Sequence, residues 1–219
     1  MAEHTLILHG IGGSHAYGLN REGSDEDHIG IFGYPTSAFW NLTKPPMSIV
    51  HHEPDEALHE LEKFLSLAAK CNPTVLEILA LDRYDRRSIW GNLLIEQRSM
   101  FFSAHYVQNA FIGYAEAQFR KMVAAWENNQ SEARAKSSKN ARHMIRLLEQ
   151  GQHLYTTGEL RVKVPDPQRY WDYEHYNHDQ LREEFVKHWG NFIASETVLP
   201  DKPDFDRINS ILYAYRKAH

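Results

Sequence analysis

Asp25 and Asp27 are two acidic residues separated by a single position near the start of the chain. We expect them to open a strand that continues through Ile29 and Phe32, and residues two apart in a strand point to the same face. Paired carboxylates on one face are typical ligands of hard cations such as Mg²⁺. Two such ions, about 3.5–4 Å apart, can activate an attacking hydroxyl and stabilise a leaving pyrophosphate, usually with a third carboxylate.

Gly13 and Ser14 form a second chemical feature, about ten residues upstream. The β-prone run 5–8 ends at a glycine-rich turn, and residues 14–18 predict one helical turn closed by Gly18. Backbone N–H groups and a hydroxyl at such a helix start can hold phosphate oxygens, and glycine leaves room for them. An Asp-x-Asp turn or a Gly-Ser pair alone is more often structural. Together, in strand-turn-strand order, they indicate a metal-dependent nucleotide site.

The surrounding pattern predicts an α/β (α+β) protein with a small mixed sheet followed by helices. Residues 48–51 read as a third strand, and apolar residues from Leu58 to Ala68 recur at helical spacing, with another helix over 74–81. We therefore expect a nucleotidyltransferase domain over 1–100 and a helical domain over 101–219 that contributes to nucleotide and acceptor binding. The long helices predicted in this second part span 106–126, 132–150, 179–196 and 205–217.

Composition narrows the class of protein. With 219 residues, 42% of them hydrophobic, the chain can bury the core of one compound domain or two small ones. A net charge of -5 excludes a broadly basic surface, so any contact with nucleic acid must be local. The single Cys71 excludes an internal disulfide and a four-cysteine zinc site. Because we see neither a secretory leader nor a membrane-spanning run, we expect a cytoplasmic protein without a membrane partner.

Histidines and aromatic residues are numerous but poorly patterned. The densest histidine group is His51, His52 and His59, which lacks the ligand spacing of a zinc site. We expect most histidines to be surface or packing residues, and the scattered tryptophans to fill core space. The run Tyr170 to Tyr173 is the one aromatic cluster that we would test for substrate contact.

Lys139, His143 and Arg146 fall at i, i+4 and i+7 of the helix predicted over 132–150. This spacing places them in one polar stripe, beside the apolar side that carries Ile145 and Leu148. Such a stripe could reach nucleotide phosphates. Basic residues on a helix more often form a solvated face, and both interpretations stay open at this point.

Residues 13–18, Gly-Ser-His-Ala-Tyr-Gly, and 24–30, Ser-Asp-Glu-Asp-His-Ile-Gly, resemble the DNA polymerase beta nucleotidyltransferase superfamily, whose pattern is Gly-Ser, a spacer and Asp-x-Asp. The Ala-Tyr-Gly ending and the Ser-Asp-x-Asp-x-x-Gly form resemble more narrowly its RlaP group, proteins of an RNA repair pathway. Further segments that match this group are Phe64 through Asn72-Pro73-Thr74 to Glu77, then Lys139, His143, Arg146 and Thr157-Gly158-Glu159. The resemblance covers most of the first 160 residues.

The resemblance implies a polymerase beta type of fold and two Mg²⁺ or Mn²⁺ ions. It implies a third acidic ligand, which alignment through Phe64 places at Asp55, with Glu53 and Glu60 as alternatives. Because Pro54 interrupts the strand that should present this ligand, Asp55 could instead cap the following helix. Nucleotide contacts are implied at Gly13 and Ser14 and at the stripe of Lys139, His143 and Arg146.

These observations favour a metal-dependent nucleotidyltransferase that moves a nucleoside monophosphate from a nucleoside triphosphate to an acceptor hydroxyl. By analogy, the RlaP resemblance favours an RNA end, structured or 3′, as acceptor. The alternative is a noncatalytic, antitoxin-like binding module with a helical protein partner. A phosphoesterase, which would hydrolyse without transfer, is a third interpretation.

Overall fold

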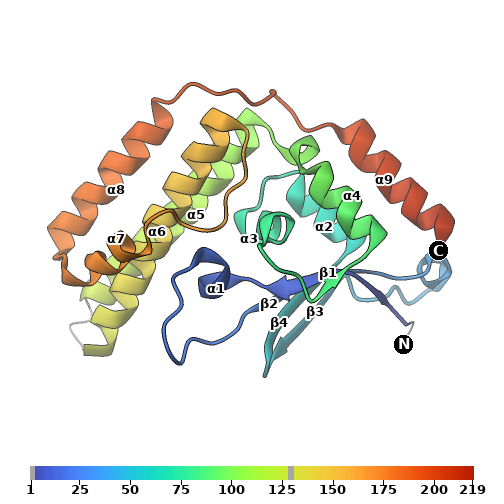
Figure 1. Cartoon of the computed structure of the whole chain (residues 1–219), viewed down its shortest axis with the longest axis horizontal. Helices are drawn as coiled ribbons and strands as arrows, with labels where there is room; N and C mark the ends of the chain where they lie inside the picture. Colours follow the sequence, from blue (N-terminus) through green and yellow to red (C-terminus); the bar gives the residue numbers. More distant parts are fainter. Residues whose placement is uncertain (1–2, 128–130) are drawn as a thin grey trace. The chain divides into compact units, whose positions relative to one another are not determined.

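The computed structural model describes residues 3–127 and 131–219. It confirms the expected α+β class, with a mixed β-sheet in the first half and a largely helical second half (Figure 1). The chain divides into two compact units, Met1–Phe102 with Pro203–His219, and Ser103–Lys202. In the described ranges no helix is both long enough and apolar enough to cross a membrane.

The sheet of the first unit has five strands in the described residues, in the order β3-β4-β2-β1-β5. β2 runs parallel to β4, and the other neighbouring pairs are antiparallel. The β2–β4 register pairs His28 with Glu56, so Asp27 and Asp55, which precede these residues, come at the same end of the sheet. The strand bounds are β1 Thr5–Ile11, β2 His28–Gly33, β3 Ser48–His52, β4 Asp55–Glu60 and β5 Arg86–Arg87.

Helices cover one face of this sheet because alternate strand residues are apolar. Ile29 and Ala57 line a small space together with Phe64 and Ile78 from the covering helices. Gly91 lies so close to Leu8 that a Cβ atom on this glycine would be only 2.4 Å from the Leu8 side chain. The covering elements are α2 Leu61–Ala68, α3 Pro73–Leu76, the 3-10 helix η2 Glu77–Ala80 and α4 Ile89–Glu96.

The opposite face is apolar only at one end. There Phe32, Tyr34 and Leu58 form a buried cluster with Ala38 of the 3-10 helix η1, Thr36–Trp40. Farther along the same face the side chains become polar, beginning with His9, which contacts Glu56. One end of the sheet is thus closed by packing, and the other presents polar side chains.

The helix expected around Leu58 begins three residues later, because β4 occupies Asp55–Glu60. Leu58 pairs with Gly30 on one side and Ile49 on the other, and it is buried between the strands. The side chain of Glu60 accepts a hydrogen bond from the Glu62 amide at 2.7 Å and caps α2. This segment forms a strand in spite of its helical periodicity because the two neighbouring strands satisfy its backbone hydrogen bonds.

Helix α9, Phe205–Ala218, packs in the first unit, although the sequence grouped it with the helical domain. Arg216 Nη2 lies 2.8 Å from Oε1 of the buried Glu60. A Cβ atom on Gly33 would lie 2.1 Å from the Tyr215 hydroxyl, so β2 and α9 are in close contact. The functional division at residue 100 stays a prediction.

The second unit is a helical bundle. Helices α5, α6 and α8 meet at Gly151, where a Cβ atom would lie 2.6 Å from Phe111 and 2.7 Å from Phe192. Asn177 and Gln180 form a capping box that starts α8. The bounds are α5 Ala104–Glu127, α6 Ser131–Thr157, α7 Pro167–Asp172, the 3-10 helix η4 Tyr173–His175 and α8 His178–Ile193.

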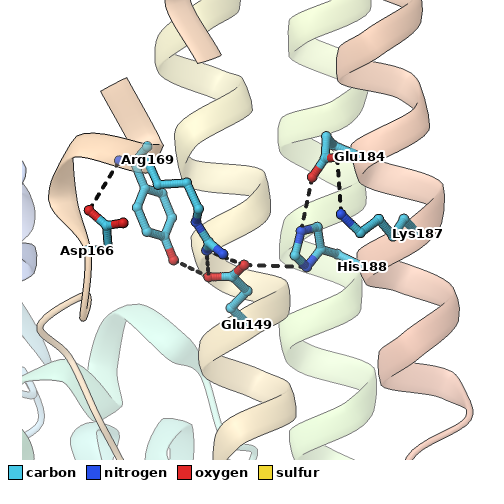
Figure 2. A network of polar contacts seen from close by, with 7 residues as sticks. Glu149, Asp166, Arg169, Glu184, Lys187 and His188 are labelled. Carbon is cyan, nitrogen blue, oxygen red and sulfur yellow. Dashed lines mark hydrogen bonds and ion pairs between the residues drawn. The ribbon is translucent and has the colours of Figure 1, made fainter. Parts of the chain in front are cut away.

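Glu149 of α6 joins three helices of this bundle (Figure 2). Its carboxylate accepts hydrogen bonds from Arg169 and from Tyr170 of α7. His188 of α8 lies 3.4 Å from the same carboxylate through Nδ1 and 3.2 Å from Glu184 through Nε2. Each helix contributes a charged or polar partner, so this network stabilises the packing of α7 and α8 on α6.

Candidate active site

The Gly13 turn lies directly beneath the carboxylate of Asp27. Gly13 has a φ of +60°, and a Cβ atom on it would lie 1.8 Å from Asp27 Oδ2. The Gly12 amide donates to the Asp27 carbonyl at 2.8 Å, which joins the end of β1 to the start of β2. Only glycine fits here, for reasons of both backbone conformation and space. The structure thus brings together the Gly-Ser turn and one of the two aspartates.

The side chain of Glu77 fixes this turn through hydrogen bonds. This buried residue accepts a hydrogen bond from the Gly13 amide at 2.6 Å and one from the Tyr17 hydroxyl at 2.5 Å. The Gly13 N–H is therefore occupied, contrary to the expectation that it would hold phosphate. Among the described residues the Ser14 hydroxyl makes no hydrogen bond, and it is the group of this pair that can bind a ligand.

Sequence reasoning assigned no site role to Glu77, although it ends the family-like segment that starts at Phe64. The Asn72 side chain caps α3 by accepting from the Thr74 and Val75 amides at 3.1 and 3.3 Å. Pro73 at the first helical position fits the start of this helix. The Asn-Pro turn therefore fixes the helical segment from which Glu77 reaches α1.

Asp25 and Asp27 lie in the loop before β2, since this strand begins at His28. We expected both residues to lie at the start of this strand, and this is wrong: the strand begins one residue after Asp27 and three residues after Asp25. Asp55 is the first residue of β4, and His28 pairs with Glu56 in the parallel register. Asp27 and Asp55 each precede this pair by one residue, so they come at the same end of adjacent strands.

The alternatives for the third carboxylate differ in position. Glu60 lies at the far end of β4, is fully buried and is paired with Arg216. Glu53 belongs to the turn between β3 and β4, before the cis peptide bond to Pro54. The helix-cap interpretation of Asp55 is wrong, because Glu60 caps α2. Of the three acids, only Asp55 lies in β4 next to the Asp27 end of β2.

We call Asp25, Asp27 and Asp55 the acidic end of the sheet, because Asp27 and Asp55 directly precede the His28–Glu56 pair and Asp25 comes two residues before Asp27. Asp25 and Asp55 are exposed, and in the part of the chain that the structure describes neither carboxylate has a hydrogen bond or ion pair. Carboxylates in this setting attract divalent cations, which neutralise their mutual repulsion. Carboxylate oxygens are the ligand type that Mg²⁺ and Mn²⁺ take, but in the described residues only His9, His28 and Asp85 form a group with all ligand atoms within 4.8 Å of one another, so metal binding by the three aspartates stays a prediction.

The stripe of Lys139, His143 and Arg146 lies on α6 of the second unit, and it changes from exposed at Lys139 to buried at Arg146. Arg146 is 6% exposed and donates to Gln150 Oε1 at 2.6 Å. Burial, followed by the charges of Arg146 and Lys139, lowers the pKa of His143 to about 3. His143 is therefore neutral at pH 7 and brings no positive charge to a phosphate. The nucleotide-binding role of the stripe stays a prediction.

The aromatic run at 170–173 is used for packing. Tyr170 and Tyr173 are buried, and burial raises the pKa of both hydroxyls. The guanidinium of Arg142 lies 4.0 Å from the ring centroid of Trp171, and it pairs with Glu174 at 3.0 Å. These contacts cover one ring face of Trp171 with a cation, and the substrate contact that we considered for this run stays a prediction.

Two features of the first unit escaped the sequence analysis. A pocket of about 380 Å³ lies beside α1, and its lining includes His15, the residue after Ser14. His9, His28 and Asp85 also meet, although they are far apart in the sequence, whereas the densest sequence group, His51, His52 and His59, does not form such a cluster among the described residues. The rest of the pocket lining is Ile11, Ala16, Leu81, Asp82, Arg83, Tyr84 and Asp85.

Comparison with known families agrees with this geometry. The model of the RNA repair pathway DNA polymerase beta family, RlaP, matches residues 1–170. This range includes the whole sheet, α1, the Glu77 segment and both long helices α5 and α6. A comparison with curated proteins gives no match. Because the family model covers more than half of the chain, the protein belongs to the RNA repair pathway DNA polymerase beta family, RlaP.

Proposed function

We propose that this chain is a Mg²⁺-dependent nucleotidyltransferase that transfers a nucleoside monophosphate from a nucleoside triphosphate to an acceptor hydroxyl. The observation that carries the proposal is the Asp27 carboxylate over the Gly13-Ser14 turn, with a Cβ on Gly13 only 1.8 Å from Asp27 Oδ2. Family membership supports the same chemistry.

Asp25, Asp27 and Asp55 would hold two Mg²⁺ or Mn²⁺ ions. Bound there, such ions would lower the pKa of the acceptor hydroxyl and neutralise charge on the leaving pyrophosphate. Ser14 would donate its hydroxyl proton to a phosphate oxygen of the departing group. Asp55 would serve as a ligand or as the base that receives the acceptor proton. Glu77 fixes the turn through Gly13 and Tyr17 and so positions Ser14.

The pocket beside α1 is a suitable place for the nucleoside. Its volume of about 380 Å³ falls within the usual range of small-molecule sites. His15 brings an imidazole into the lining directly after Ser14, and Arg83 and Tyr84 add a cation and an aromatic ring. A triphosphate at Ser14 would therefore have a partly apolar, partly polar cavity beside it.

The acceptor that we favour is an RNA end, because the family is named for an RNA repair pathway. The net charge of -5 argues against tight binding of long nucleic acid by overall attraction. Recognition would therefore depend on the shape and the terminal hydroxyl of a compact RNA.

The experiment is a labelling reaction with each α-labelled nucleoside triphosphate, Mg²⁺ or Mn²⁺, and host RNA. We expect labelled RNA from the wild type and at least a thousandfold less from the double variant Asp25→Asn with Asp27→Asn. Glu22→Gln, an exposed acid in the same loop, is the matched control and should retain full activity. Equal labelling by the double variant would exclude this site.

The same reaction separates the alternatives. Release of labelled nucleoside monophosphate without labelled acceptor would identify a phosphoesterase. A protein partner at a fixed ratio, together with the lack of any triphosphate turnover, would identify the noncatalytic binding module. Label on protein or on a small molecule would keep the transferase and change its acceptor.

A further inference from the structure

His9, His28 and Asp85 form a cluster on the polar part of the sheet. They come from β1, from β2 and from the residue before β5, and one ligand atom from each lies within 4.8 Å of the other two. His9 Nδ1 is 3.1 Å from Asp85 Oδ2. His28 directly follows Asp27, and Glu56 directly follows Asp55 in β4, where alternation along the strand directs the Asp55 and Glu56 side chains to opposite faces of the sheet.

Glu56 orients His9 within the cluster. Its Oε1 lies 3.3 Å from His9 Nε2, so both imidazole nitrogens of His9 face carboxylates. A neutral imidazole carries one N–H, which can satisfy only one of these two contacts. A proton or a cation must therefore lie between the other nitrogen and its carboxylate. A carboxylate behind a histidine ligand is a frequent arrangement in metal sites, because it fixes the ring.

His28 provides an independent sign of a missing ligand. Its Nδ1 atom is shielded from solvent and has no hydrogen-bond partner among the described residues. The rings of His9 and His28 are stacked, with centroids 5.4 Å apart and planes 15° from parallel. A buried nitrogen without a partner is costly, and a metal ion would satisfy it.

We propose that this cluster binds one divalent transition-metal ion of the zinc class, with His9, His28 and Asp85 as ligands and Glu56 holding His9. Two imidazoles favour Zn²⁺ over Mg²⁺, and a fourth position remains for water. Ligand atoms about 2.1 Å from a tetrahedral ion lie roughly 3.4 Å apart. The His9–Asp85 atoms, 3.1 Å apart, are close to this separation. The His28 ligand atom lies within 4.8 Å of both, so the proposal requires the His28 ring to move closer when the ion binds.

The ion would connect three segments that are far apart in the sequence. One of its ligands, His28, directly follows Asp27. Its role is to fix the start of β2, whereas the ions proposed for transfer bind at Asp25, Asp27 and Asp55. Asp85 also lines the pocket that we propose for the nucleoside, but none of the zinc ligands is among the residues proposed to bind the transfer ions or the phosphates, so either proposal can fail without the other.

The test is a calorimetric titration of the full chain with Zn²⁺ in excess Mg²⁺, followed by the visible absorption of Co²⁺ as a probe of four-coordinate geometry. We expect one Zn²⁺ per chain and intense Co²⁺ bands. Asp85→Asn and His28→Gln should weaken Zn²⁺ binding at least tenfold, and Glu56→Gln ten- to a hundredfold. His52→Gln, an exposed histidine of β3, should bind as the wild type does.

Asp85 is exposed, so its variant keeps the test valid should a strand histidine variant misfold. Equal Zn²⁺ affinity in Asp85→Asn and the wild type would overturn the proposal, as would the lack of stoichiometric binding by the wild type. Loss of Zn²⁺ binding in the Asp25→Asn, Asp27→Asn variant would overturn it as well, because the ion would then lie at the acidic end. Unchanged binding in that variant supports a separate site.

Discussion

Two carboxylate sites in this protein, one in each unit, differ in what surrounds them. Glu149 of the helical unit is contacted by Arg169, Tyr170 and His188 (Figure 2). Asp25 and Asp55 in the sheet unit are exposed, without hydrogen bonds or ion pairs to their carboxylates in the described residues. Donors already neutralise the first site, whereas the second requires cations from solution. The difference separates a carboxylate that stabilises the fold from those suited to chemistry.

Among the single substitutions that test this comparison, Gly13→Ala is expected to give the largest effect, a loss of transfer activity of at least a hundredfold. The new methyl group would lie 1.8 Å from Asp27 Oδ2, so the carboxylate must move. Gly23→Ala is the matched control, because Gly23 also has a positive φ, of +81°, but nothing lies within 4 Å of its Cβ. Both variants carry about 1–2 kcal/mol of backbone strain.

Initial rates and thermal melting of the two glycine variants would sharpen this comparison. We expect similar losses of stability and very different rates. If Gly23→Ala lost as much activity as Gly13→Ala, backbone strain would explain the effect, and the contact with Asp27 would have no special role.

Glu149→Gln tests the other carboxylate and should lower the free energy of unfolding by about 2 kcal/mol. The amide retains the shape but loses charge-assisted hydrogen bonds to Arg169 and the contact with His188. Urea unfolding measures the effect, with the exposed Glu183→Gln on α8 as control. A loss no larger than that of the control would show that the network contributes little.

His143 gives the helical unit a pH dependence of stability that we expect to be no larger than the effect of Glu149→Gln. Its pKa is lowered from 6.5 to about 3 by burial and neighbouring cations, so below pH 6.5 the unfolded chain binds a proton that the folded chain does not. The stability that the neutral His143 contributes to the folded chain is fully present above pH 6.5 and is lost as the pH falls toward 3. Between pH 7 and 5 the loss is about 2 kcal/mol.

His143→Gln should therefore make the acid limb of the stability curve shallower. The wild type minus variant difference in unfolding free energy should decrease as the pH is lowered from 7 to 5. Urea midpoints across this range, with His52→Gln as control, measure the change. Parallel curves for His143→Gln and the wild type would show that His143 takes up protons in the folded chain as it does in the unfolded one.

The local parts of the candidate site could be predicted from the sequence, and the long-range parts could not. The Gly-Ser turn and Asp27 are joined by neighbouring strands, so short spacing was enough to relate them. Asp55 gains its place from the parallel pairing of β2 with β4, which no local pattern encodes. Leu58 fitted a helical period equally well, and only pairing on both sides makes it a strand residue.

Burial explains the remaining differences. The stripe with Arg146 could have been solvated along its whole length because only one side of its helix is apolar. Lys139 is exposed, whereas the packing of unit 2 buries Arg146. His9, His28 and Asp85 meet only because β1, β2 and β5 are neighbours in the sheet. Residue spacing carries no sign of such a cluster when its members come from three separate segments.

We propose that the acidic end of the sheet binds the catalytic ions beside Ser14. The most direct measurement is the anomalous scattering of Mn²⁺ in crystals of the protein with a nonhydrolysable nucleoside triphosphate. We predict Mn²⁺ peaks within coordination distance of the Asp25, Asp27 and Asp55 carboxylates, with the triphosphate at the Ser14 hydroxyl. Mn²⁺ bound elsewhere, or a triphosphate bound away from Ser14, would contradict the account.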